Sequence, residues 1–196
     1  RIGDFILTAP AVAALRARHP QAEIVAVVPD SMTDLSGCMP GLDRVLSYRG
    51  ARPNLAVWSS LLIGEWDACY DFTGTDRSAL MAWISRAKER HGYARFVSGK
   101  WKAMAYTHLC PASVRELHTV DFHLALTAET SPEASLPAVL ELRADQVFKV
   151  PAMTAAETLG PNYAVVHIGT AREEKFWPPQ RWLAVVEHLI EQRQLR

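Results

Sequence analysis

The sequence contains no apolar run long enough to cross a lipid bilayer. A transmembrane helix needs about 20 consecutive apolar residues, and the longest candidate, Leu55 to Ile63, is shorter and contains two serines. No amino-terminal signal peptide is recognisable, but the chain begins at Arg1 without a methionine, so this absence says little about location. An integral membrane protein is not predicted.

Cysteine is scarce, and neither sign of charge is in excess. Cys38, Cys69 and Cys110 stand alone, and an odd, scattered set predicts buried or half-buried free thiols in a reducing compartment rather than a disulfide framework. The 21 basic and 21 acidic side chains cancel. The basic excess typical of nucleic-acid-binding proteins is therefore missing, although a local basic patch stays open.

Standard cofactor and metal motifs are absent as well. The chain has neither GxGxxG nor GxxxxGK[ST], so a standard dinucleotide site or P-loop has no support. HExxH, CxxC and carboxylate clusters are missing, so zinc and calcium sites are not predicted. His118 and His123 are five positions apart and fall on different helix faces, so we expect polar packing residues rather than a shared metal site.

What the chain does contain is an alternation of short apolar runs and helical patterns. The run Ile24–Val28 does not alternate with polar residues, which is typical of a strand covered on both faces in a parallel sheet. The alternation predicts an open, doubly wound α/β domain. In that architecture a strand precedes the Gly3-Asp4 turn, so we expect the chain to begin after its first strand. The expected helices are 5–18, 55–64, 78–88 and 118–129, and the expected strands are 24–28, 44–48, 68–72 and 90–93.

A change in composition divides the chain. Residues 130–137 are rich in proline, serine and acidic side chains, which indicates a linker. We therefore expect an N-terminal domain over 1–129, a linker region over 130–160 and the opening strand and helix of a second domain over 161–196. The expected elements beyond the N-terminal domain are a strand at 139–142, a helix at 153–159, a strand at 163–168 and a helix opened by Trp177-Pro178.

Two segments carry residues suited to chemistry. Asp4 follows the first turn, at the sheet edge where doubly wound domains bind ligands, and it is either a general base or the cap of a helix. Gly169 and Thr170 end the apolar run of the second domain, and Lys175 follows shortly before a helix start. Such a turn, cation and helix N-terminus can hold a diphosphate, or they form an ordinary connection with an exposed lysine.

A third segment gathers cations and aromatic residues between 93 and 102. Arg95, Lys100 and Lys102 alternate there with Tyr93, Phe96 and Trp101. These cations can receive an anionic substrate, although a solvated surface loop explains them nearly as well.

Taken together, these segments resemble glycosyltransferase family 9, the heptosyltransferases of bacterial lipopolysaccharide core assembly. Matches in order along the whole chain are more specific than any one of them. They are Arg1-Ile-Gly-Asp-Phe-Ile-Leu-Thr-Ala-Pro10, His19-Pro-Gln-Ala-Glu-Ile-Val25, Trp66-Asp-Ala-Cys-Tyr-Asp-Phe-Thr-Gly74 with Arg77-Ser78, His91-Gly-Tyr93, His118-Thr-Val-Asp-Phe-His-Leu-Ala-Leu126, and His167-Ile-Gly-Thr170 with Lys175-Phe-Trp-Pro178.

The resemblance implies a GT-B fold, in which two Rossmann-like domains bind acceptor and donor respectively. The chain would hold the N-terminal acceptor domain, with its parallel sheet lacking the first strand, and the start of the donor domain. The implied reaction is inverting transfer of a heptose from ADP-heptose to a hydroxyl of the lipopolysaccharide core. Asp4 takes the position of the general base, and the donor diphosphate meets Lys175, with Thr170 and Gly169 in support. As a fragment, the chain is expected to be inactive alone.

Further assignments also follow from the resemblance. Acceptor contacts are expected from Gly3, Thr73, Gly74, Arg77, Arg95 and Lys100. No cofactor or metal is expected, and the partners would be the nucleotide sugar and a lipid-linked acceptor, not nucleic acid. The protein would be cytoplasmic, with peripheral contact to the inner membrane. The alternatives are another GT-B nucleotide-sugar enzyme, such as an epimerase or a transferase for a different sugar, and a non-catalytic module that binds an anionic glycolipid or a nucleotide.

Overall fold

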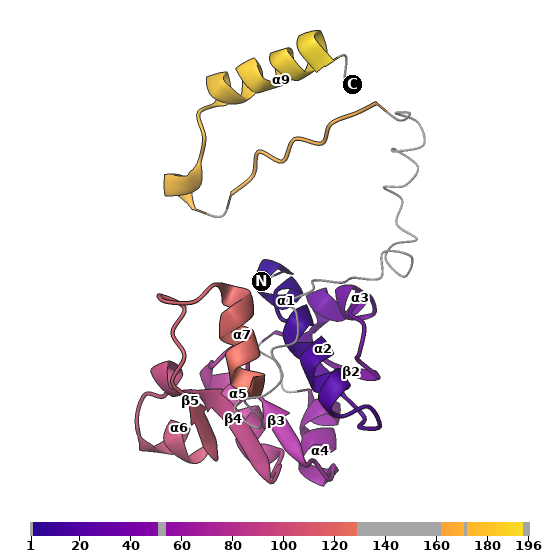
Figure 1. Cartoon of the computed structure of the whole chain (residues 1–196), viewed down its shortest axis with the longest axis vertical. Coiled ribbons are helices and arrows are strands. Elements are labelled where there is room, and N and C mark those ends of the chain that lie inside the picture. Colours follow the sequence, from indigo (N-terminus) through magenta and orange to yellow (C-terminus); the bar gives the residue numbers. More distant parts are fainter. Residues whose placement is uncertain (1, 51–53, 129–161, 171, 194–196) are drawn as a thin grey trace. The chain divides into compact units, whose positions relative to one another are not determined.

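The computed structural model describes residues 2–50, 54–128, 162–170 and 172–193 (Figure 1). The chain divides into two compact units, Arg1–Val147 and Phe148–Arg196, and each is described by itself. The linker region predicted over 130–160, with its expected strand and helix, lies outside the described residues. None of the described helices is both long and apolar enough to cross a membrane.

The first unit alternates helices and strands, as the sequence predicts. Its helices are α1 (Ile2–Ile6), α2 (Ala9–Arg18), α3 (Thr33–Ser36), α4 (Leu55–Ile63), α5 (Asp76–Ile84), α6 (Lys100–Met104) and α7 (Thr119–Ala128). Its strands are β1 (Val25–Pro29), β2 (Arg44–Tyr48), β3 (Ala68–Tyr70), β4 (Glu89–Tyr93) and β5 (His108–Cys110). Short 3-10 turns are η1 (Asp30–Met32) and η2 (Ala94–Phe96).

All strand pairs in the described part of the first unit are parallel. β1 pairs with β2, and β3, β4 and β5 form a second sheet with β4 in the centre. Tyr70, His91 and His108 stand in register across the three strands, and their rings stack with centroids 4.6 Å apart at each step. The predicted α/β class with parallel strands is confirmed.

The single helix expected over 5–18 is wrong, because the chain forms two helices there. Thr8 interrupts them: its hydroxyl donates to the Phe5 carbonyl at 2.6 Å, which closes a tight turn after α1. Pro10 lacks a backbone N–H and sits in the first turn of α2, where this donor is not needed. Asp4 therefore lies on a helix of its own, ahead of the break.

The elements α3, α6 and β5 of the first unit were not predicted. α6 and β5 lie in the mixed segment between residues 99 and 111, where neither a helical nor an alternating apolar period stands out. β5 has the sequence His-Leu-Cys, and it is a strand because it pairs with β4. Tertiary pairing decides the structure of such short segments.

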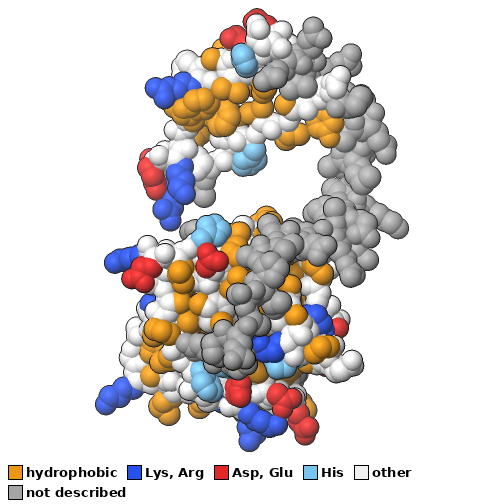
Figure 2. Space-filling view, viewed as in Figure 1, with side chains coloured by type: hydrophobic (Ala, Val, Ile, Leu, Met, Phe, Trp, Pro, Cys, Tyr) orange, Lys and Arg blue, Asp and Glu red, His pale blue; other side chains and the backbone are white. Residues whose placement is uncertain are grey.

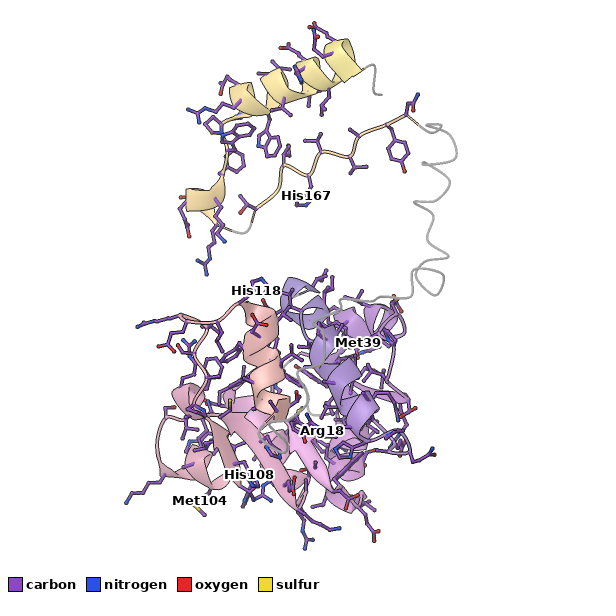
Figure 3. All side chains as sticks on the ribbon, in the orientation of Figure 1. Arg18, Met39, Met104, His108, His118 and His167 are labelled. Carbon is purple, nitrogen blue, oxygen red and sulfur yellow. The ribbon has the colours of Figure 1, made fainter. Side chains whose placement is uncertain are left out.

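The core of the second sheet lies under α7. Tyr93 of β4 stacks on Phe122 of α7 with ring centroids 3.9 Å apart, and Cys110 and Leu126 complete this buried cluster. Arg18 at the end of α2 donates to the Thr127 carbonyl of α7, which ties the two helices together (Figure 3). Cys38 and Cys110 are buried and Cys69 is half-buried, all as free thiols, as the sequence predicts.

The second unit consists of an extended segment, a 3-10 turn and a helix. The helix expected after Trp177-Pro178 is confirmed as α9 (Pro179–Arg193), and η4 (Glu173–Lys175) precedes it. The strand expected over 163–168 is wrong: residues 163–170 have no regular secondary structure, because no described strand pairs with their backbone groups. Figure 2 shows hydrophobic side chains gathered along α9, among which Leu183 and Ile190 are exposed.

Candidate functional site

A buried carboxylate organises the turn that follows β3. Oδ1 of Asp71 accepts hydrogen bonds from the Thr73 backbone N–H at 2.9 Å, the Thr73 hydroxyl at 3.0 Å and the Gly74 N–H at 3.0 Å. Oδ2 accepts from the Tyr106 hydroxyl at 2.7 Å. Asp71 is 5% exposed, so its oxygens are used inside the protein rather than offered to a substrate.

Gly74 is the residue that the geometry of this turn requires. Its φ is +64°, in the left-handed region that side chains disfavour. A Cβ at this position would overlap the ring of Phe96, which lies directly against it. Gly74 is thus a buried structural element of the predicted acceptor site, whereas the neighbouring Thr73 is exposed.

Lys102 fixes the other side of the turn. The sequence places it with Lys100 as a surface cation, and for Lys102 this is wrong: the residue is 4% exposed. Its ammonium donates to the Gly74 carbonyl at 2.7 Å and to Oδ1 of Asp76 at 3.0 Å. The short helix α6 turns this side chain inward, and a buried ammonium needs such acceptors to offset lost hydration.

The other cations of the predicted acceptor site are exposed. Arg77, on the first turn of α5, lies over the ring of Tyr48 with 5.2 Å between guanidinium carbon and ring centre. Arg95 lies over Phe96 at 5.0 Å. Because Phe96 also covers Gly74, Arg95 stands beside the turn. Lys100 begins α6 and is exposed.

Asp4 lies in the first turn of α1 and is exposed. The alternative role as a cap does not apply to α2, because that helix begins at Ala9 with Thr8 at its N-cap position. At Gly3, an added Cβ would meet no described atom within 4 Å, so packing does not require a glycine there. An accessible carboxylate of this kind can take a proton from a bound hydroxyl group.

His123 of α7 is a buried histidine on which the charge of Asp4 acts. Its Nδ1 lies 3.0 Å from the hydroxyl oxygen of Tyr93, and its ring meets the edge of Phe72. Burial lowers the pKa of His123 to about 4, and the nearby Asp4 carboxylate opposes this shift. At neutral pH the imidazole is therefore uncharged, and its Nε2 has no hydrogen-bond partner in the described part of the chain.

A neutral, buried His123 makes stability depend on pH. The unfolded chain binds a proton at this residue near pH 6.5, while the folded chain does so only near pH 4. The stabilisation is therefore complete above pH 6.5 and is lost as the pH falls toward 4, by about 3 kcal/mol in total. We expect urea unfolding at pH 7 and pH 4.5 to show a smaller difference for His123→Phe than for the wild type.

The control is His19→Gln, because His19 is exposed. This variant should keep the wild-type dependence on pH. If the free energy of unfolding changed equally between pH 7 and pH 4.5 in His123→Phe and the wild type, a neutral His123 in the folded chain would be contradicted.

The predicted diphosphate residues of the second unit are exposed. The Thr170 hydroxyl oxygen accepts from the Arg172 N–H at 3.4 Å, which closes a small turn after Gly169. Arg172 pairs with Glu174 at 3.5 Å, whereas Lys175, at the end of η4, has no ion-pair partner among the described residues. Asp4 and Lys175 lie in separate units, so their joint action stays a prediction.

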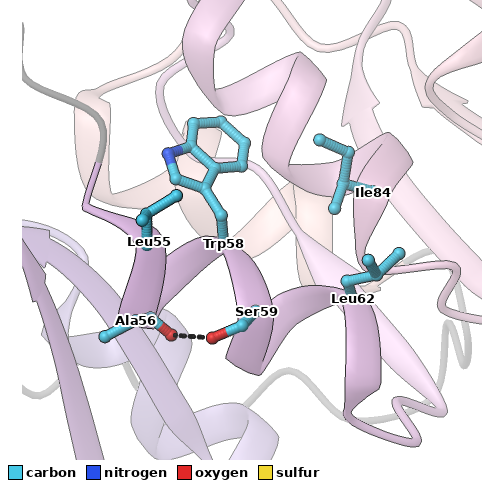
Figure 4. Close-up of a pocket in the computed structure, with 6 residues that line it drawn as sticks. All are labelled: Leu55, Ala56, Trp58, Ser59, Leu62 and Ile84. Atoms are coloured by element: carbon cyan, nitrogen blue, oxygen red, sulfur yellow. Dashed lines mark hydrogen bonds between the residues drawn. The ribbon is translucent and has the colours of Figure 1, made fainter.

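Away from these residues, an apolar hollow of about 480 Å³ lies between α4 and the end of α5 (Figure 4). It contains no residue predicted for the site.

Two of the histidines lie far apart on the first unit. Figure 3 shows His118 beside the start of α7 and His108 on β5, so these two residues do not share a site. The expectation that no metal takes part stays a prediction.

Solved structures of heptosyltransferases resemble the chain along almost its whole length. E. coli heptosyltransferase WaaC with ADP matches with a TM-score of 0.72 and 19% identity, over 98% of this chain and 62% of that one. The glycosyl transferase family 9 structure from Veillonella parvula DSM 2008 gives 0.74 and 17%, over 96% and 56%. E. coli ADP-heptose lps heptosyltransferase II gives 0.67 and 18%, over 97% and 59%.

These likenesses confirm the predicted GT-B fold class, and the chain spans less than two thirds of the length of each of these structures. No protein of curated function matches the sequence. Glycosyltransferase family 9 (heptosyltransferase) matches residues 54–196, which include both the Asp71 turn and Lys175. With most of its residues in that match, the chain belongs to glycosyltransferase family 9, the heptosyltransferases.

Proposed function

We propose that the full-length protein transfers a heptose from ADP-heptose to a hydroxyl of a lipopolysaccharide core acceptor, with inversion at the anomeric carbon. The observation that carries the proposal is the family match over residues 54–196. The solved relatives add support, because WaaC is described with ADP and with ADP-2-deoxy-2-fluoro heptose.

In this proposal Asp4 is the general base. A neutral hydroxyl is a poor nucleophile, so a carboxylate oxygen must take its proton as the acceptor oxygen bonds to the anomeric carbon. The exposure of Asp4 on α1 suits this role, since an acceptor has to reach it. The imidazole of His123, on which the Asp4 charge acts, is neutral at neutral pH and therefore does not pair with this carboxylate as a cation.

Lys175 meets the leaving group in the same step. As the bond between the anomeric carbon and the phosphate oxygen breaks, negative charge collects on the departing ADP. An exposed ammonium without an ion-pair partner among the described residues is suited to neutralise that charge, with Thr170 and Gly169 contributing polar groups nearby. Positive charge from the protein would replace a metal ion here.

The acceptor is proposed to lie at the Asp71 turn. Thr73, Arg77, Arg95 and Lys100 are exposed there, and core acceptors carry phosphates and acidic sugars that such cations recognise. Because this acceptor is lipid-linked, the proposal includes peripheral contact with the cytoplasmic face of the inner membrane.

The experiment that tests the proposal is acceptor-dependent ADP release by the full-length protein with ADP-heptose and heptose-deficient lipopolysaccharide. A Lys175→Ala variant should lose about 10²-fold in kcat, because one stabilising charge on the leaving group is removed. Lys88→Ala is the matched control, since Lys88 is an exposed lysine paired with Asp67. Release of the nucleotide from another nucleotide sugar, but not from ADP-heptose, would show that the donor is that other sugar. Binding of ADP-heptose without release of ADP would favour the non-catalytic module.

A further inference from the structure

The turn between β3 and α5 is held from two directions by side chains that follow β4 in the sequence. Tyr106 reaches Asp71, which in turn holds the Gly74 N–H, and Lys102 holds the Gly74 carbonyl. Both backbone polar groups of Gly74 are therefore fixed by buried side chains. The left-handed φ of this residue adds a third constraint, because Phe96 closes over the space where a side chain would lie.

Stability alone does not account for the lysine in this arrangement. Burying an ammonium costs hydration free energy, and a buried ion pair is often no more stabilising than well-packed apolar residues of the same volume. The Lys102 side chain is 5% exposed, while its partner Asp76 is 80% exposed, so water screens the attraction on one side. What Lys102 provides beyond packing is a defined direction for the Gly74 carbonyl.

That direction determines how the exposed part of the turn is presented. Thr73 precedes Gly74 directly, and Thr75 follows it as the N-cap of α5, where it accepts from the Ser78 N–H at 3.1 Å. Arg77 lies on the first turn of that helix. A change in the backbone dihedral angles of Gly74, which these hydrogen bonds prevent, would move Thr73 and the start of α5 relative to each other.

We propose that Lys102 is a positioning residue for acceptor binding: by holding the Gly74 carbonyl, it keeps Thr73 and Arg77 in one fixed arrangement toward the acceptor. The inference rests on the proposed function, because it takes the acceptor to be the ligand of this turn. Lys102 does not touch the acceptor itself, since its ammonium is buried and engaged within the protein.

The test is Lys102→Met in the full-length protein, which keeps the side-chain length and removes the hydrogen bond to Gly74. We expect the KM for heptose-deficient lipopolysaccharide to rise about tenfold, because the acceptor must then order a turn that the lost charge-assisted hydrogen bond no longer holds. The KM for ADP-heptose should stay at its wild-type value. Asp76→Asn is the control, because it removes the charged partner and leaves the bond to the Gly74 carbonyl.

A double-mutant cycle separates positioning from a general loss of fold. If Lys102 acts through the turn, Lys102→Met should have little further effect on the acceptor KM in an Arg77→Ala background. Additive effects, or an unchanged acceptor KM in an active Lys102→Met enzyme, would overturn the inference and leave the proposed function standing. A wild-type protein that releases no ADP with this acceptor would overturn both.

If Lys102→Met does not fold, Tyr106→Phe tests the same turn from its other side, because it removes only the hydrogen bond to Asp71. A raised acceptor KM in this variant, with an unchanged KM for ADP-heptose, supports the positioning of the turn by these side chains. An unchanged acceptor KM overturns it.

Discussion

Replacing Asp4 with asparagine is expected to lower acceptor-dependent ADP release by about 10²–10⁴-fold, the usual contribution of a general base. Asparagine has nearly the same shape but cannot take the proton from the acceptor hydroxyl. Because Asp4 is exposed and lies on the short helix α1, the substitution should leave the fold and the binding of ADP-heptose intact. The measurements are kcat with saturating substrates and the Kd for ADP-heptose by calorimetry.

Asp34→Asn is the matched control for this variant. Asp34 is also an exposed carboxylate in the first turn of a short helix, and no role in the site is assigned to it. It should retain wild-type kcat. Undiminished release by Asp4→Asn would mean that Asp4 is not the base and that another group takes the proton.

The second large effect is expected on stability. Asp71→Ala should lower the free energy of unfolding by about 3 kcal/mol, because each buried donor left unpaired costs about 1–3 kcal/mol. The donors in question are the Tyr106 hydroxyl and the Gly74 N–H, both of which lie in buried residues. Urea unfolding followed by far-UV circular dichroism measures this loss.

Asp67→Ala is the comparison for the Asp71 variant. Asp67 also lies next to β3, but it is exposed and its partner Lys88 is exposed as well. Its removal should change the unfolding midpoint little, since exposed ion pairs contribute little to stability. Equal midpoints for the two variants would show that Asp71 does not organise the turn.

Much of the fold could be predicted because its elements carry a clear local signal. β2 was predicted with its observed bounds, β1 and α4 with small shifts at their ends, and α9 by its start after Trp177-Pro178. The period of the apolar residues and the position of proline are sufficient there. β5 and α6 are different, because their sequences carry no such period and their structure depends on β4 and on the turn at Gly74.

The candidate site was predictable only in part, for a related reason. Thr73, Arg77, Arg95 and Lys100 were expected to be available, and they are exposed. Lys102 was expected beside them but is buried, because sequence spacing does not show which way a side chain on a short helix points. His123 was expected to be a packing residue, and the effect of Asp4 on it depends on how α7 packs within the first unit, which no local pattern records.

Under the proposed function, the way the turn is built also defines where the acceptor preference could be redesigned. Asp71, Gly74, Lys102 and Tyr106 form one closed set of contacts, in which any replacement disturbs the other members. Thr73 and Arg77 project from that set into solvent. A library that varies these two positions and keeps the four supporting residues would sample new specificities on an unchanged scaffold.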